Sequence, residues 1–191
     1  MSFDSLFQSP DAERQRFLAG LFTLFSGDII RCWAADKQAP YRIPGTPLLR
    51  EINGSRGYTL DYALQTPKRL YVAMLRCDPV ADGPLNSAAQ VEAQATTRAF
   101  AAFLDAGRNP VNYFAIINGE ELPVAGSILI WGSASLRAQR AVKKTYGLHD
   151  VLTMEGILGD LAQWQNREFQ MLLDRRIAWS HDFYRGLRQI R

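Results

Sequence analysis

The stretch that decides the fold is GYTLDYALQTPKRLYVAMLRCDP, residues 57–79. Two runs rich in β-branched, aromatic and aliphatic residues, YTLDYAL and RLYVAMLRC, flank the polar segment QTPKR, which predicts two strands joined by a hairpin loop. Asp61 is expected in the middle of the first strand. Arg76 comes late in the second strand, on the same face as Met74, because side chains alternate along a strand. The hairpin therefore predicts an acid and a base on neighbouring strands.

The segments around this hairpin predict alternating helices and strands. Apolar residues recur at helical spacing in residues 17–25, and an alanine-rich helix is expected over residues 87–106. The segment NPVNYFAII is predicted to be a strand, NGEELPVAG a loop and SILIWG a strand. A helix follows from Ser133 or Ser135 to Tyr146, and LHDVLTM forms a last strand. The pattern predicts an α/β fold with a mixed central sheet flanked by helices.

Length and composition predict one soluble domain. The chain has 191 residues, and we expect a single domain over 1–191 in which residues 155–191 form a helical C-terminal extension, bent near Gly159. Its two cysteines, Cys32 and Cys77, form no CxxC pair, which argues against a disulfide framework and a zinc site. With no signal-peptide pattern and no uninterrupted apolar run long enough to span a membrane, a cytoplasmic location without membrane contact is expected.

The hairpin and the order of the elements resemble the PD-(D/E)xK nuclease superfamily, which has the restriction-endonuclease-like fold. The resemblance extends over residues 10–118. It implies a metal-binding aspartate at Asp61 and an acid-x-lysine tripeptide at residues 74–76. In that family, Mg²⁺ held by carboxylates activates water and stabilises the charge that develops during phosphodiester cleavage. The resemblance therefore implies nuclease chemistry at the hairpin.

Residues 74–76 are Met-Leu-Arg, which departs from the family's motif. Met74 lacks the hard oxygen donors that Mg²⁺ requires, and Arg76 cannot lose a proton at working pH. The catalytic candidates Asp61 and Arg76 therefore predict a degenerate site, in which Arg76 can hold a phosphate. Mg²⁺ is expected only if another acid, Asp78 or Glu51, joins Asp61. The simpler alternative is an exposed ion pair between Asp61 and Arg76.

Basic residues gather in two further places. The segment SLRAQRAVKK carries Arg137, Arg140, Lys143 and Lys144, which we expect to contact DNA. The C-terminal helix combines arginines with an apolar seam and suits a protein partner or a homo-oligomer. The net charge of +3 is compatible with an anionic partner without requiring one.

Three functions follow from these patterns. The leading hypothesis is a nuclease-like protein whose active site is inactive or altered and which retains a nucleic-acid-binding or protein-interaction role in DNA processing or defence. The first alternative is an active Mg²⁺-dependent DNA endonuclease that uses Asp61 and a displaced acid. The second is a structural or assembly module that acts through its C-terminal helix.

Overall fold

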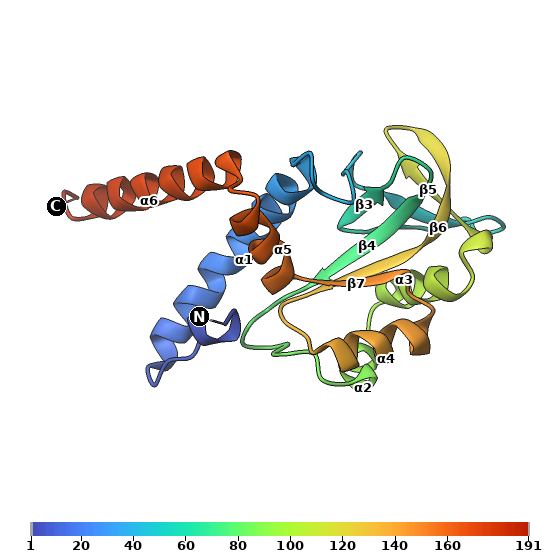
Figure 1. The fold of residues 1–191 in the computed structure, drawn as a ribbon, viewed down its shortest axis with the longest axis horizontal. Helices are drawn as coiled ribbons and strands as arrows, with labels where there is room; N and C mark the ends of the chain where they lie inside the picture. Colours follow the sequence, from blue (N-terminus) through green and yellow to red (C-terminus); the bar gives the residue numbers. More distant parts are fainter. Residues whose placement is uncertain (1, 191) are drawn as a thin grey trace.

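The computed structural model describes residues 2–190, and there a seven-stranded mixed sheet is flanked by helices (Figure 1). The helices are α1 (Ala12–Ala35), α2 (Ala88–Ala93), α3 (Arg98–Arg108), α4 (Leu136–Tyr146), α5 (Met154–Gln163) and α6 (Arg167–Leu187), with short 3-10 turns η1 (Asp4–Leu6) and η2 (Pro110–Asn112). The strands are β1 (Leu48–Glu51), β2 (Gly57–Thr59), β3 (Tyr62–Gln65), β4 (Leu70–Arg76), β5 (Tyr113–Ile117), β6 (Glu120–Trp131) and β7 (Asp150–Thr153). The predicted α/β class, with a mixed sheet between helices, is confirmed.

The sheet curls back on itself because its two terminal strands are consecutive in the chain. The strand order is β2-β1-β5-β6-β4-β3, and β7 pairs with β6. Only Leu60 and Asp61 separate β2 from β3. The segment before β1 pairs with them, since Leu60 N donates to the Pro47 carbonyl and Ala63 N to the Gly45 carbonyl, each at 3.1 Å. Asp61 therefore lies where the two ends of the sheet meet.

Strand β6 joins the antiparallel half of the sheet to the parallel half. Its first residues, 120–123, pair antiparallel with β5, whereas residues 124–131 pair parallel with β4 and, further along, with β7. Gly126, with φ +147°, allows a backbone conformation there that other residues rarely adopt. The prediction of a loop over NGEELPVAG, after β5, is wrong. Only Asn118 and Gly119, both with positive φ, turn the chain, as in a two-residue hairpin.

Two apolar cores fill the two faces of the sheet. The core under α2, α3 and α4 contains Phe103 and Val142, and the core under α1 and α5 contains Trp33 and Leu161. Successive residues of β4 alternate between the two cores, as the pleat of a strand requires. Helices therefore cover both faces of the sheet that contains the hairpin of β3 and β4 (Figure 1).

Two predicted helices are each divided in the structure. The helix expected over residues 87–106 is α2 and α3, because the Thr97 side chain caps a new helix. The C-terminal tail divides after residue 164 and not near Gly159, which lies within α5. There Gln165 has φ +51° and the Asn166 side chain caps α6. Residues 155–187 are otherwise helical, as expected of the C-terminal extension.

Helix α1 is long and apolar enough to cross a membrane, judged by length and composition alone. The sequence predicts no membrane-spanning segment, because polar residues interrupt every apolar run in α1. The helix as a whole is nevertheless apolar on average. About a third of the apolar window is buried in the protein. The finding is weak evidence for a membrane, because a core helix of a soluble protein passes the same test.

Candidate functional site

Asp61 lies at a break between β2 and β3 and not in the middle of one strand, so that expectation was wrong. Leu60 and Ala63 belong to the core under α3, whereas Tyr62 and Leu64 belong to the core under α1. Regular alternation would place Leu60 and Tyr62 on one face, so the chain shifts by one residue at Asp61. The shift leaves Asp61 exposed to solvent.

The Asp61 carboxylate supports the backbone of the neighbouring strand. Its Oδ2 accepts a hydrogen bond from the Leu75 backbone N at 2.7 Å. Pairing between β3 and β4 ends where Tyr62 lies opposite Ala73. The Leu75 N lies beyond the last paired residues of β3 and β4, where no backbone carbonyl of β3 is left to accept its hydrogen bond. The Asp61 carboxylate accepts that bond instead, which is a structural role.

Met74 and Arg76 occupy the two positions where the resemblance implies an acid and a lysine. Met74 is 5% exposed and lies in the same core as Phe100, so a carboxylate in its place would be buried among apolar side chains. The Arg76 guanidinium donates to the Leu75 carbonyl at 2.7 Å and lies 4.9 Å from the centre of the Phe100 ring. Asp61 and Arg76 form no ion pair among the salt bridges of residues 2–190, and both contact the Leu75 backbone instead.

Asp78, the nearer of the two acids considered as a second metal ligand, organises the loop after β4. Its Oδ1 accepts hydrogen bonds from the backbone N atoms of Val80 and Ala81, both at 2.9 Å. This is the local turn that aspartate side chains commonly stabilise. One carboxylate oxygen of Asp78 is therefore committed to the loop.

Glu51, the other acid, lies far from Asp61. In the pairing of β1 with β2, Leu48 is opposite Thr59. Continuing this register places Asp61 opposite residue 46, five residues away from Glu51 along the strand. At the rise of a β-strand this is roughly 16 Å, too far for two carboxylates to share one ion. The structure does not bring Glu51 into the site.

The side chains around Asp61 do not fit a metal ion. Across residues 2–190, no three His, Cys, Asp or Glu side chains form a group that could hold one. Burial, with smaller contributions from the carboxylates of Asp82, Asp78 and Asp61, raises the pKa of the nearby Cys77 thiol to about 12. Such a buried thiol favours the protonated form at neutral pH, which makes it a poor nucleophile.

Asp82 is a half-buried acid that is not among the site residues predicted from the sequence. It accepts hydrogen bonds from the Gln94 side-chain amide at 2.9 Å and from the Asp78 backbone N at 2.8 Å. Burial raises the pKa of the Asp82 carboxyl group. The Asp-Gly pair at residues 82–83 signals a turn in the sequence, but its contact with the end of α2 needs the folded chain. These bonds fasten the loop after β4.

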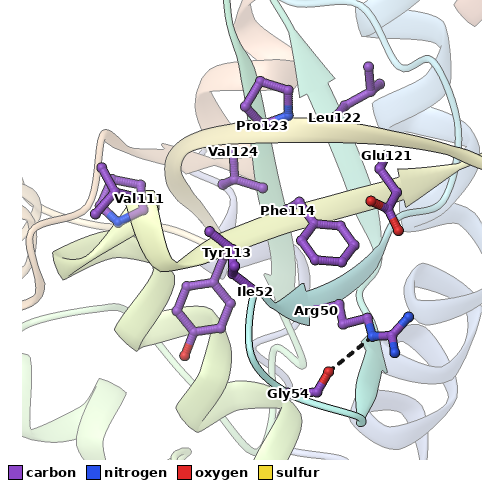
Figure 2. Close-up of a pocket in the computed structure, with 11 residues that line it drawn as sticks. Arg50, Ile52, Gly54, Val111, Tyr113, Phe114, Glu121, Leu122, Pro123 and Val124 are labelled. Carbon is purple, nitrogen blue, oxygen red and sulfur yellow. Dashed lines mark hydrogen bonds between the residues drawn. The ribbon is translucent and has the colours of Figure 1, made fainter.

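A hollow of about 770 Å³ lies elsewhere, between β1, η2 and the β5–β6 hairpin (Figure 2). Apolar side chains such as Val111, Tyr113 and Phe114 form much of its wall, and Arg50 and Glu121 are its charged residues. The Arg50 Nε donates to the backbone carbonyl of Gly54, as Figure 2 shows. The lining offers no nucleophile paired with a base, so this hollow carries no recognisable catalytic group.

Helix α4 presents most of the predicted cationic residues to solvent. Arg137, Arg140 and Lys144 are exposed. Helical spacing places these three within about 60° of one another around the helix axis. The helix contains no acidic residue. Lys143 differs, because its Nζ donates to the Asp150 carboxylate at 2.9 Å. Three of the four predicted cations therefore share one free face.

Comparison of the chain with family models, curated proteins and solved structures gave no match of any of the three kinds. Three features of the side chains bear on function: an aspartate that accepts a hydrogen bond from the neighbouring backbone, a buried methionine where an acid would be needed, and an exposed cationic helix face.

Proposed function

We propose that this chain is a nuclease-like domain that binds nucleic acid and does not cleave it. The observation that carries the proposal is the cationic face of α4, formed by Arg137, Arg140 and Lys144. Such a face can neutralise backbone phosphates and release their counterions, which is the main source of sequence-independent binding. The mild excess of positive charge in the whole chain agrees with this role.

The nuclease-like part of the proposal rests on the order of the elements. A long helix, α1, precedes two antiparallel strand pairs, β1 with β2 and β3 with β4. Helix α3 then leads through β5 to β6, which runs parallel to β4, and α4 leads to β7, which runs parallel to β6. This arrangement supports a restriction-endonuclease-like fold as a proposal, because it follows the element order that the resemblance implies.

The lack of cleavage follows from residues 74–76. Met74 is sealed in an apolar core and Arg76 is held against Phe100 and the backbone. The acid and the lysine that would position a metal and its water are both replaced. Among residues 2–190, no further acids join Asp61 in a group that could hold a metal ion.

The proposal is tested by fluorescence anisotropy with labelled single- and double-stranded DNA over a range of salt concentrations. We expect binding that weakens steeply with salt, and the double variant Arg137→Glu/Arg140→Glu should bind about ten-fold more weakly or worse. The matched control is Lys37→Glu/Lys68→Glu, which makes the same charge change at exposed positions away from α4. Absence of binding, or an equal loss in both variants, would contradict the proposal.

A cleavage assay with the same DNA in Mg²⁺ or Mn²⁺ separates binding from catalysis. The proposal predicts intact substrate. Cleavage by the wild type that Asp61→Ala abolishes would instead establish the active endonuclease.

A further inference from the structure

The C-terminal half of α6 presents large apolar side chains to solvent. Helix α6 extends from the body of the protein, and its C-terminal end lies furthest from the sheet (Figure 1). Five of its side chains are 47% to 69% exposed and together define what we name the α6 tip surface: Ile177, Trp179, Phe183, Tyr184 and Leu187. Isolated exposed apolar residues are common, but a continuous group of this size marks an interaction site.

The α6 tip surface continues a face that is already used for packing. Helical spacing places its five side chains on an arc of about 160°, and Phe169, Leu172 and Leu173 from the first turns of α6 fall on the same arc. These three pack in the core that also holds α1 and α5. The arc therefore has a partner in its first half, whereas its second half is uncovered by the described chain.

Helix α1 adds a second uncovered area beside this surface. Arg176 of α6 contacts Asp28 at 2.5 Å and lies 5.1 Å from the centre of the Phe25 ring, so the two helices meet there. The same side of α1 continues toward its N-terminus with Phe17 and Leu24, which are 50% and 76% exposed. The exposed apolar side chains of α1 and of α6 thus lie beyond the contact between the two helices at Arg176, each along its own helix.

The amount of exposed surface suits a dimer. A buried aromatic side chain covers about 150–250 Å², so the five side chains of the α6 tip surface, each about half exposed, offer on the order of 500 Å² per copy. This is less than the roughly 800 Å² that one partner contributes to a standard stable interface and suits a weaker, concentration-dependent dimer. Removing that area from water requires a partner with a matching apolar face.

Charge favours a second copy of this chain over a polyanion or an anionic membrane. Residues 174–188 contain four bases, Arg175, Arg176, Arg185 and Arg188, and two acids, Asp174 and Asp182, and Arg176 is paired with Asp28 of α1. When His181 is neutral, this leaves an excess of about one positive charge, and the five apolar side chains themselves are uncharged. A membrane-surface helix or a phosphate-binding helix carries a larger excess of cations on its polar face. Two neutral apolar surfaces of the same kind can meet about a two-fold axis without repulsion.

We propose that two copies of this chain form a dimer through their α6 tip surfaces, with the two α6 helices antiparallel. The first turns of each α6 are covered by its own body, so only the tips can overlap. Antiparallel overlap places the two bodies at opposite ends of the helix pair and brings the middle of each tip, Phe183 and Tyr184, close to the two-fold axis.

Sedimentation velocity over a wide concentration range tests the dimer. We expect the full chain to shift from monomer to dimer with increasing concentration, and Trp179→Glu/Phe183→Glu to remain monomeric with an unchanged circular dichroism spectrum. Val111→Glu, which alters an 80% exposed apolar residue on η2, should dimerise like the wild type. A wild type that stays monomeric at every concentration would overturn the proposal. If that monomer instead co-sediments with anionic vesicles in a separate assay, the α6 tip surface binds membranes and the proposal is equally overturned.

Cross-linking tests the arrangement of the two helices. Tyr184→Cys should give a disulfide-linked dimer on mild oxidation, whereas Ala178→Cys, on the opposite side of α6, should not. A dimer that persists in Trp179→Glu/Phe183→Glu, or cross-links equally through both cysteines, would contradict pairing through the α6 tip surface.

Discussion

Replacing Asp61 distinguishes its structural role from a role as a metal ligand. The structure gives the carboxylate one backbone contact, from Oδ2 to the Leu75 N at 2.7 Å. Asp61→Ala removes this acceptor, whereas Asp61→Asn keeps a side-chain carbonyl oxygen that can accept the same hydrogen bond. A structural aspartate should therefore tolerate asparagine better than alanine.

The contact sets the size of the expected effect. A hydrogen bond of this kind contributes about 1 kcal/mol to the free energy of unfolding when water competes for the exposed carboxylate. For a domain of this size, that loss lowers the melting temperature by about 2–4 °C. We expect Asp61→Ala to show this decrease and Asp61→Asn to lose less than about half of it.

The assay is thermal unfolding followed by circular dichroism, with and without millimolar Mg²⁺. We expect the metal to leave the melting temperature of the wild type and of both variants unchanged, because residues 2–190 contain no group of carboxylates that could hold it. The reasoning is refuted if Mg²⁺ stabilises the wild type and neither variant. It is also refuted if asparagine destabilises the protein as much as alanine does.

Three further predictions concern side chains around the sheet. The ring of His149, an exposed residue, stacks on Tyr71 with centroids 4.0 Å apart, and this partial desolvation lowers its pKa. Its small contribution to stability is therefore present above the ordinary histidine pKa and is lost as pH falls. The melting temperature of the wild type should therefore fall more steeply below pH 6.5 than that of His149→Gln, and parallel curves would count against this. Cys77, buried with a pKa of about 12, should react with iodoacetamide only after unfolding, as mass spectrometry can show; rapid labelling of the native protein would disprove its burial. Asn166→Ala removes both the cap on the Phe169 N and the bond from Nδ2 to Asp36, whereas Asn166→Ser can keep the cap and loses the bond to Asp36. Asn166→Ala should therefore lower the free energy of unfolding by about 1 kcal/mol more than Asn166→Ser, and denaturant titrations with equal values would be inconsistent with the cap.

Local signals predicted much of the fold. The loop between β3 and β4 follows from the polar residues between two apolar runs, and Ser135 and Gly147 mark the ends of α4 as their chemistry suggests. The turn at Asn118 and Gly119 was missed although the Asn-Gly pair is a strong hairpin signal. That error was avoidable, because it depends on two adjacent residues.

The environment of Asp61 could not be predicted from local pattern. The run YTLDYAL has the alternation of one strand, and the break within it depends on pairing with Gly45, Pro47 and Leu75, which are distant in sequence. The separation of Glu51 from Asp61 likewise follows from the strand register, which no single segment specifies. The sequence identifies Met74 as a poor metal ligand from its chemistry alone, and the structure adds that its position is buried.

The most direct test of the central claim is a crystal structure of the protein soaked with Mn²⁺, with anomalous scattering used to locate the ion. We predict no Mn²⁺ at Asp61 and an unchanged hydrogen bond from the Leu75 N to the Asp61 carboxylate. An ion bound by Asp61 together with a second carboxylate would contradict the account and restore the metal-dependent nuclease.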